Sequence, residues 1–127
     1  MTRILIVDDD PDMVEAGRIV LEAKGYEVVS AANASQGLSA LEESKPDLMI
    51  LDVMMEEPDD GIRMARRVRQ KGFDLPILML TSVNVAMGLQ IDKHDEMVPV
   101  DEFQEKPVDP GTLIKKVEQL LAAREEA

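Results

Sequence analysis

The sequence predicts a single α/β domain, a doubly wound sandwich in which a parallel sheet is covered by helices on both faces. Two observations lead to this prediction. Short and almost wholly apolar runs, typical of strands buried on both faces, recur along the chain and end in polar residues. They alternate with segments in which apolar residues recur at helical spacing. Five strands alternating with five helices are therefore expected.

Composition indicates one acidic domain. The chain has 127 residues, with 26 Asp and Glu against 14 Lys and Arg, so its net charge is −12. This charge disfavours direct binding to nucleic acid or to an anionic membrane and favours a cation or a basic partner. The length fits one domain over residues 1–127, without an output domain.

The residue types exclude several kinds of chemistry. Without cysteine the chain has no disulfide and no thiolate nucleophile, which is compatible with a reducing cytoplasm. No apolar segment is long enough to span a bilayer or to act as a secretion signal, so a cytoplasmic location is expected. The only histidine, His94, lies in a polar run, which leaves little basis for a zinc site or a Ser/His triad.

The first strand and helix are clearly marked. Residues 4–7 form an apolar run that ends in three acids. Asp10 followed by Pro11 is typical of the start of a helix, and Gly25 is placed to end it. A second strand is expected within residues 26–32, which are rich in β-forming residues.

The third strand contains an acid that its pattern does not explain. Asn33 or Ser35 can cap a helix that ends before Pro46, and the apolar run 48–55 follows, interrupted only by Asp52. Burying an unpaired charge costs on the order of several kcal/mol, so Asp52 is expected at the exit of this strand. Taken alone, an Asp at this position is more simply explained as ending a strand or capping the next turn.

The helix expected within residues 62–71 has one apolar side. Its other side carries mainly arginines, which are Arg63, Arg66, Arg67 and Arg69. This cluster can attract an acidic partner, but a solvated helix face is the favoured interpretation.

The remaining elements are less regular. Residues 76–81 predict a fourth strand, and residues 82–99 permit a helix whose bounds the pattern does not define. Residues 100–105 are poorly apolar and predict a strand at the sheet edge. Asp109 followed by Pro110 marks the start of the last helix.

Polar residues follow these strands at positions that the topology brings together. Right-handed crossovers place every strand-to-helix loop at one edge of the sheet, where ligands of such folds bind. The residues at these strand ends are Asp8, Asp9, Asp52, Thr81 and Lys106. Three carboxylates there repel one another unless a divalent cation and a lysine offset their charge. Oxygen ligands without His or Cys suit Mg²⁺.

Four fragments, in this order, resemble those of a response-regulator receiver domain: residues 4–11, 51–55, 80–82 and 103–107. The resemblance extends from end to end of the chain. It implies a flavodoxin-like three-layer sandwich, similar to a single-domain chemotaxis regulator. It also implies two-component phosphorelay signalling, in which Asp52 accepts a phosphoryl group from a sensor histidine kinase or a phosphotransfer protein.

The resemblance further implies a Mg²⁺ site. Asp9, Asp52 and the backbone carbonyl of Met54 would hold the ion, and Asp8 would support it through water. These are the metal-binding residues that the family pattern assigns to this sequence.

The same resemblance implies roles for three residues on or just after the last two strands. Lys106 would pair with the phosphoryl oxygens, and Thr81 would hydrogen-bond to them once the group is attached. Phe103 occupies the position of the family's switch aromatic, although it can also be an ordinary core residue. Movement of Thr81 would couple phosphorylation to Phe103 and so to the protein surface.

The chain departs from the family pattern in two places. Residues 55–61 look like a small insertion, which adds acids beside the metal site. The segment between Thr81 and Lys106 is a few residues longer than usual. Because this segment includes the family's usual output surface, the downstream target does not follow from the resemblance.

Two other functions would use the same residues. A Mg²⁺-dependent aspartyl-phosphate hydrolase would use Asp52 as its nucleophile, but Met54 stands where such enzymes carry a second Asp. A pseudo-receiver would act only as an interaction module, which the complete residue set argues against. The favoured hypothesis is a receiver that catalyses its own phosphorylation and dephosphorylation at Asp52 and acts as a monomer or a phosphorylation-dependent dimer.

Overall fold

The computed structural model describes residues 2–52, 60–81, 102–105 and 109–126. Five strands and four helices lie within these ranges. They are β1 (Arg3–Val7), α1 (Pro11–Ala23), β2 (Glu27–Ala31), α2 (Ala34–Ser44), β3 (Leu48–Asp52), α3 (Asp60–Gln70), β4 (Ile77–Thr81), β5 (Glu102–Glu105) and α5 (Pro110–Glu126). The helix permitted by residues 82–99 lies outside the described residues.

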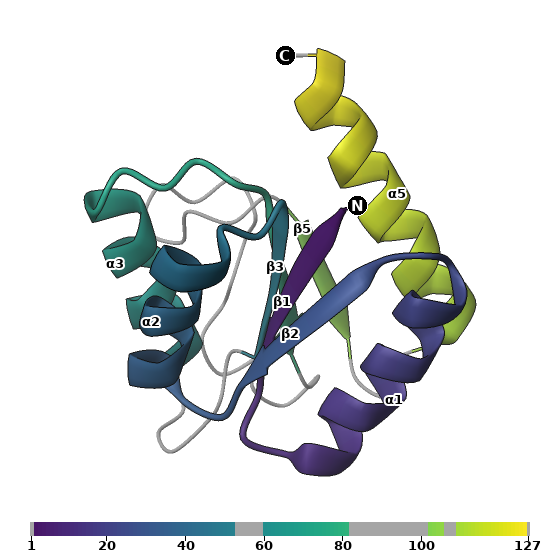
Figure 1. The fold of residues 1–127 in the computed structure, drawn as a ribbon, viewed down its shortest axis with the longest axis horizontal. Coiled ribbons are helices and arrows are strands. Elements are labelled where there is room, and N and C mark those ends of the chain that lie inside the picture. The colour runs from purple at the N-terminus through teal and green to yellow at the C-terminus, as the bar shows by residue number, and fades with distance from the viewer. Residues whose placement is uncertain (1, 53–59, 82–101, 106–108, 127) are drawn as a thin grey trace.

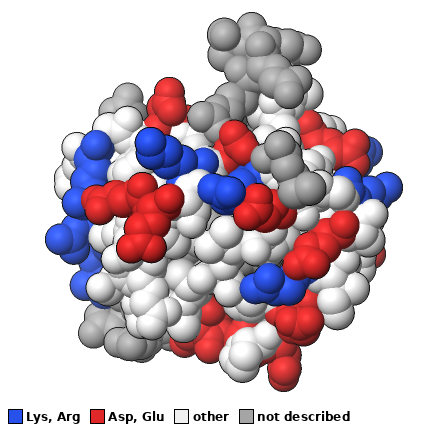
Figure 2. Space-filling model, viewed as in Figure 1, with Lys and Arg blue, Asp and Glu red and all other residues white. Residues whose placement is uncertain are grey.

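The strands form one parallel sheet in the order β2-β1-β3-β4-β5. Helices α1 and α5 cover one face, and α2 and α3 cover the other, which confirms the predicted doubly wound sandwich (Figure 1). In the same view, basic side chains gather along the left edge of the molecule, where α3 lies (Figure 2). No helix in the described ranges is long and apolar enough to cross a membrane.

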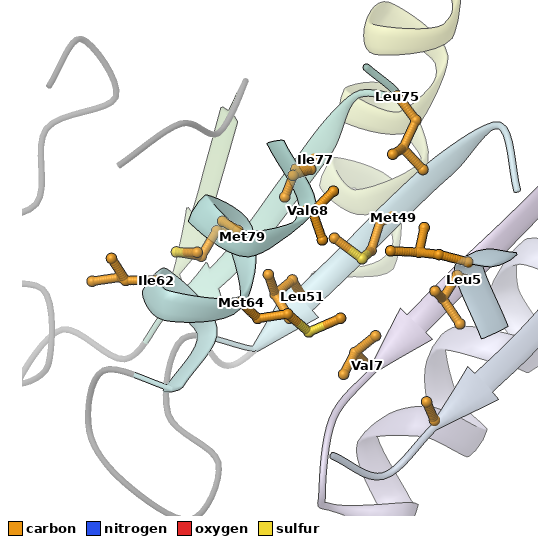
Figure 3. Packing of buried hydrophobic residues seen from close by; sticks show 13 residues of the cluster. Leu5, Val7, Met49, Leu51, Ile62, Met64, Val68, Leu75, Ile77 and Met79 are labelled. Carbon is orange, nitrogen blue, oxygen red and sulfur yellow. The ribbon is translucent and has the colours of Figure 1, made fainter. Parts of the chain in front are cut away.

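The sheet has a hydrophobic cluster on each face, which explains why its strands are apolar throughout. Along β1, Leu5 and Val7 pack toward α2 and α3, whereas Ile4 and Ile6 pack toward α1 and α5. Figure 3 shows the first of these clusters, in which side chains of β1, β3 and β4 meet those of α3. All five residues of β3 are buried, so it is a central strand, as expected.

The helix boundaries follow local side-chain chemistry. Asp10 caps α1, and its Oδ1 accepts a hydrogen bond from the backbone N–H of Asp12 at 3.0 Å. Asn33, rather than Ser35, caps α2, because Asn33 Oδ1 accepts from the N–H of Gln36 at 2.9 Å. Gly25 follows α1 with a φ of 90°, a left-handed conformation that costs glycine little.

Strand β5 lies at one edge of the sheet, as its polar composition predicts. Gln104 is nevertheless buried there, and its side-chain amide donates to the backbone carbonyl of Asp109 at 3.5 Å. Asp109 in turn caps α5: its Oδ2 accepts from the N–H of Thr112 at 2.9 Å and from the hydroxyl of Thr112 at 2.8 Å. One side-chain hydrogen bond, from Gln104, therefore joins the edge strand to the cap of the last helix.

The cap of α5 predicts a pH-dependent contribution to stability. Hydrogen bonds from Thr112, first from its backbone N–H and then from its hydroxyl, lower the pKa of Asp109 below 3.8. A carboxyl group with a lowered pKa in the folded state stabilises the fold above its ordinary pKa, and the effect is lost as pH falls through the lowered pKa. Asp109→Ala should therefore be less stable than wild type at neutral pH, and the difference should shrink below pH 3.8.

Urea unfolding over a series of pH values measures this difference. Asp109→Asn is the matched control, since it keeps a side-chain oxygen for the cap but cannot ionise. The difference in the free energy of unfolding between Asp109→Asn and Asp109→Ala should depend little on pH. A wild-type advantage over Asp109→Ala that is the same at neutral and at acidic pH would argue against an ionised cap.

Candidate functional site

Three acids meet at the carboxyl edge of the sheet. Val7 of β1 pairs with Leu51 of β3, so Asp8 and Asp52 follow at neighbouring positions, with Asp9 next along the chain. One carboxylate oxygen from each of the three acids lies within 4.8 Å of the others. The structure thus brings together the three carboxylates that the sequence predicted to converge.

The burial of these acids differs. The relative exposure of Asp8 is 2% and that of Asp52 is 4%, whereas Asp9 is exposed. Asp8 is held on both sides: its backbone N–H donates to the carbonyl of Ala31 at 3.1 Å, and its Oδ1 accepts from the N–H of Asp10 at 2.9 Å. Two carboxyl groups therefore lie under the surface, with a third exposed beside them.

This donor set fits a hard divalent cation. All three groups offer carboxylate oxygens, which Mg²⁺ and Ca²⁺ prefer, and among the described residues no nitrogen or sulfur ligand joins them. Oxygens up to 4.8 Å apart allow direct ligation by some carboxylates and contact through water by another. A bound cation would also offset the mutual repulsion of the acids.

The structure places the other predicted site residues only in part. Thr81 is the last residue of β4 and follows Leu80, the residue that pairs with Asp52. Phe103 lies in β5, and its backbone pairs with Met79. The structure describes neither of their side chains. Met54 and Lys106, the predicted metal ligand and phosphoryl partner, lie outside the described residues.

An open depression beside the carboxylates was not predicted. It has a volume of about 510 Å³, and Asp8, Asp9, Arg18, Ser30 and Gln36 are among the residues that line it. Arg18 links α1 to β2, because its guanidinium donates to the carbonyl of Val28 at 3.4 Å and to Ser30 Oγ at 3.3 Å.

The sequence contained a signal for the ion pairs of Arg18 but not for this link. Glu15 and Glu22 lie three residues before and four residues after Arg18, and both are within 4.0 Å of its guanidinium, at 3.9 and 3.5 Å. This spacing predicts ion pairs on a helix surface. It does not predict that the arginine reaches the neighbouring strand.

Comparison with known proteins identifies the family. The family model described as "Response regulator receiver domain" matches residues 4–118. PhoP of Bacillus subtilis, an alkaline phosphatase synthesis transcriptional regulatory protein, is 33% identical over 127 residues, covering 97% of this chain and 50% of PhoP. An uncharacterized 14.6 kDa protein of Leptolyngbya boryana is 40% identical over 123 residues, covering 94% of this chain and 90% of that protein.

Solved structures agree with this result. CheY4 of Vibrio cholerae superposes with a TM-score of 0.82 and 29% identity, covering 94% of this chain and 98% of CheY4. TrrA of Thermotoga maritima, in complex with Mg(2+)-BeF, superposes with a TM-score of 0.80 and 31% identity, covering 94% of this chain and 99% of TrrA.

The share of each relative's own length that the chain covers differs among the relatives. The chain spans about half the length of PhoP and of several other transcriptional regulators that it matches. In contrast, it covers nearly all of CheY4 and TrrA. On the family match over residues 4–118 and on these relatives, the chain belongs to the response regulator receiver domains, which act in phosphorylation-based two-component signalling.

Proposed function

We propose that Asp52 is the phosphoacceptor of this receiver and that Asp8 and Asp9 help to hold Mg²⁺ beside it. The observation that carries the proposal is the cluster of three carboxylates at the ends of β1 and β3. The structure of TrrA in complex with Mg(2+)-BeF supports the choice of ion. The proposed phosphoryl donor is a sensor histidine kinase or a phosphotransfer protein, the partners with which receiver domains interact.

In the proposed reaction, a carboxylate oxygen of Asp52 attacks the phosphorus of a phosphohistidine. The P–N bond breaks as the new O–P bond forms, and the released imidazole nitrogen keeps the electron pair and takes up a proton. Positioning and charge neutralisation dominate such transfers, because the phosphoryl group needs little covalent assistance. Mg²⁺ would supply positive charge to the phosphoryl oxygens.

The protein's own contribution is to position the attacking oxygen. Asp52 ends a strand that is buried along its whole length, and neighbouring strands pair with it on both sides. Its carboxylate therefore has little freedom to turn away from the carboxyl edge of the sheet. The exposed Asp9 lies at the opening, where the donor must approach.

We also propose roles for the residues around this centre. Lys106 would neutralise the phosphoryl oxygens, and the carbonyl of Met54 would complete the metal site. Thr81 would donate a hydrogen bond to the attached phosphoryl group, since its strand lies next to that of Asp52. Phe103, on the following strand, would transmit this change to the surface. Hydrolysis of the acyl phosphate at the same centre would return the domain to its unphosphorylated state. The proposed location of this cycle is the cytoplasm.

The phosphoacceptor is tested by labelling. Wild-type protein incubated with Mg²⁺ and acetyl phosphate, or with a phosphorylated histidine kinase, should gain one phosphoryl group that hydroxylamine removes, as expected of an acyl phosphate. Asp52→Asn should gain none, because an amide is not a nucleophile here. Intact-protein mass spectrometry measures both.

Glu43→Gln, which removes an exposed acid of α2 far from the cluster in sequence, is the matched control and should be labelled like wild type. Failure of wild-type protein to accept a phosphoryl group while it binds Mg²⁺ would contradict the proposal. Labelling that persists in Asp52→Asn would instead place the acceptor elsewhere.

The metal site is tested separately by titration with Mg²⁺. Asp9→Asn removes one proposed ligand and should weaken Mg²⁺ binding about tenfold or more, since ligand charge strongly affects affinity. Asp9 is exposed, so the substitution should leave the fold intact. Isothermal titration calorimetry measures the change. Asp12→Asn, which neutralises a nearby exposed acid of α1, should bind like wild type; equal weakening in both variants would indicate only a general effect of charge.

A further inference from the structure

The basic residues of this acidic chain are concentrated on α3. Five of its 14 Lys and Arg lie within residues 63–71, and no Asp or Glu occurs between Gly61 and Phe73. The band of basic side chains at the left edge of Figure 2 coincides with the position of α3 in Figure 1. A local positive surface therefore exists on a molecule whose net charge is −12.

Three of these cations lie in one line on the helix. Arg63, Arg67 and Lys71 are exposed and are spaced four residues apart, so they form a single row on the outer side of α3 and its end. We refer to these three residues as the cationic row. Like charges at this spacing destabilise a helix, so the row opposes the stability of the element that carries it.

The helix dipole explains only part of this arrangement. Lys71 Nζ lies 3.6 Å from Oε1 of Glu42, and this ion pair helps to join the end of α3 to α2. The helix dipole favours cations in the last turn, where Arg67 lies, but disfavours one near the start, where Arg63 lies. The dipole therefore accounts for the charge of Arg67 but not for that of Arg63.

Arg69 differs from the row and serves as a contrast. Its guanidinium donates to the backbone carbonyls of Phe73 at 3.1 Å and Leu75 at 2.7 Å, so it holds the turn between α3 and β4. This arginine is structural. Arg67, in contrast, is exposed.

We propose that the cationic row is a docking surface for a short acidic segment of another protein. Residues 63–71 are nine residues, and the eight helical rises between them make the row about 12 Å long, which matches about four residues of extended peptide. Arginine guanidinium groups bind carboxylates in two-point hydrogen bonds, which a lysine cannot form. The row shares no residue with the carboxylate cluster, and the proposed docking does not involve the phosphoryl group.

Charge complementarity favours a short acidic peptide over nucleic acid. The Debye length is about 8 Å at physiological ionic strength, so a short segment on α3 responds to the row rather than to the charge of the whole molecule. A duplex carries charge well beyond 12 Å, and its flanking phosphates would meet a molecule with 26 acidic residues. The row is too short to offset that repulsion.

The test is binding of a short fluorescent oligoglutamate peptide to the full chain, followed by anisotropy at low and at physiological ionic strength. Wild type should bind, and added salt should weaken the complex. Arg67→Glu should weaken binding about three- to tenfold, because it removes one attraction and adds one repulsion. Arg67→Gln should give an intermediate loss and carries less risk to the end of the helix.

Lys115→Glu is the matched control, because it makes the same charge change at an exposed position of α5. It should bind the peptide like wild type, and far-ultraviolet circular dichroism should show that all variants are folded. The proposal is wrong if wild type does not bind the peptide at low ionic strength or if Lys115→Glu loses as much affinity as Arg67→Glu. Tighter binding of a short DNA duplex than of the peptide would also overturn it.

Discussion

Asp8 and Asp52 are held almost completely out of solvent, next to one another, with the carboxylate of Asp9 at the opening. At the separations found here, two ionised carboxylates repel each other by on the order of 3 kcal/mol. With Asp8 and Asp52 both ionised, this repulsion would place an electrostatic cost at the carboxyl edge of the sheet. A divalent cation would remove most of this cost and a phosphoryl group would add to it, so the proposed site would respond to both.

The rest of the structure provides the rigidity that keeps Asp8 and Asp52 close together despite this electrostatic cost. Apolar clusters on both faces of the sheet fix β1 and β3, and the pairing of Val7 with Leu51 sets the acids side by side. A one-residue shift between these strands would separate Asp8 from Asp52 and turn side chains toward the wrong face. The continuous burial of β3 thus both stabilises the domain and positions the proposed nucleophile.

Much of this could be predicted from the sequence because it depends on local pattern. Continuous apolar runs predict strands buried on both faces, and the cap of α1 at Asp10 is typical helix chemistry. The choice of Asn33 over Ser35 and the reach of Arg18 to β2 depend on three-dimensional packing, which periodicity does not encode. The convergence of the three acids could be predicted, because right-handed crossovers bring strand ends together whatever the details of packing.

The repulsion between the clustered carboxylates is tested most directly by the free energy of unfolding of wild type and of Asp52→Asn. It is measured by urea unfolding, once with a chelator and once with saturating Mg²⁺. Without divalent cation, Asp52→Asn should be more stable than wild type by about 1 to 3 kcal/mol, because one buried charge is gone. Mg²⁺ should stabilise wild type clearly and the variant much less. The account would be contradicted if Asp52→Asn were less stable than wild type in the chelator and if Mg²⁺ raised the free energy of unfolding of both proteins equally.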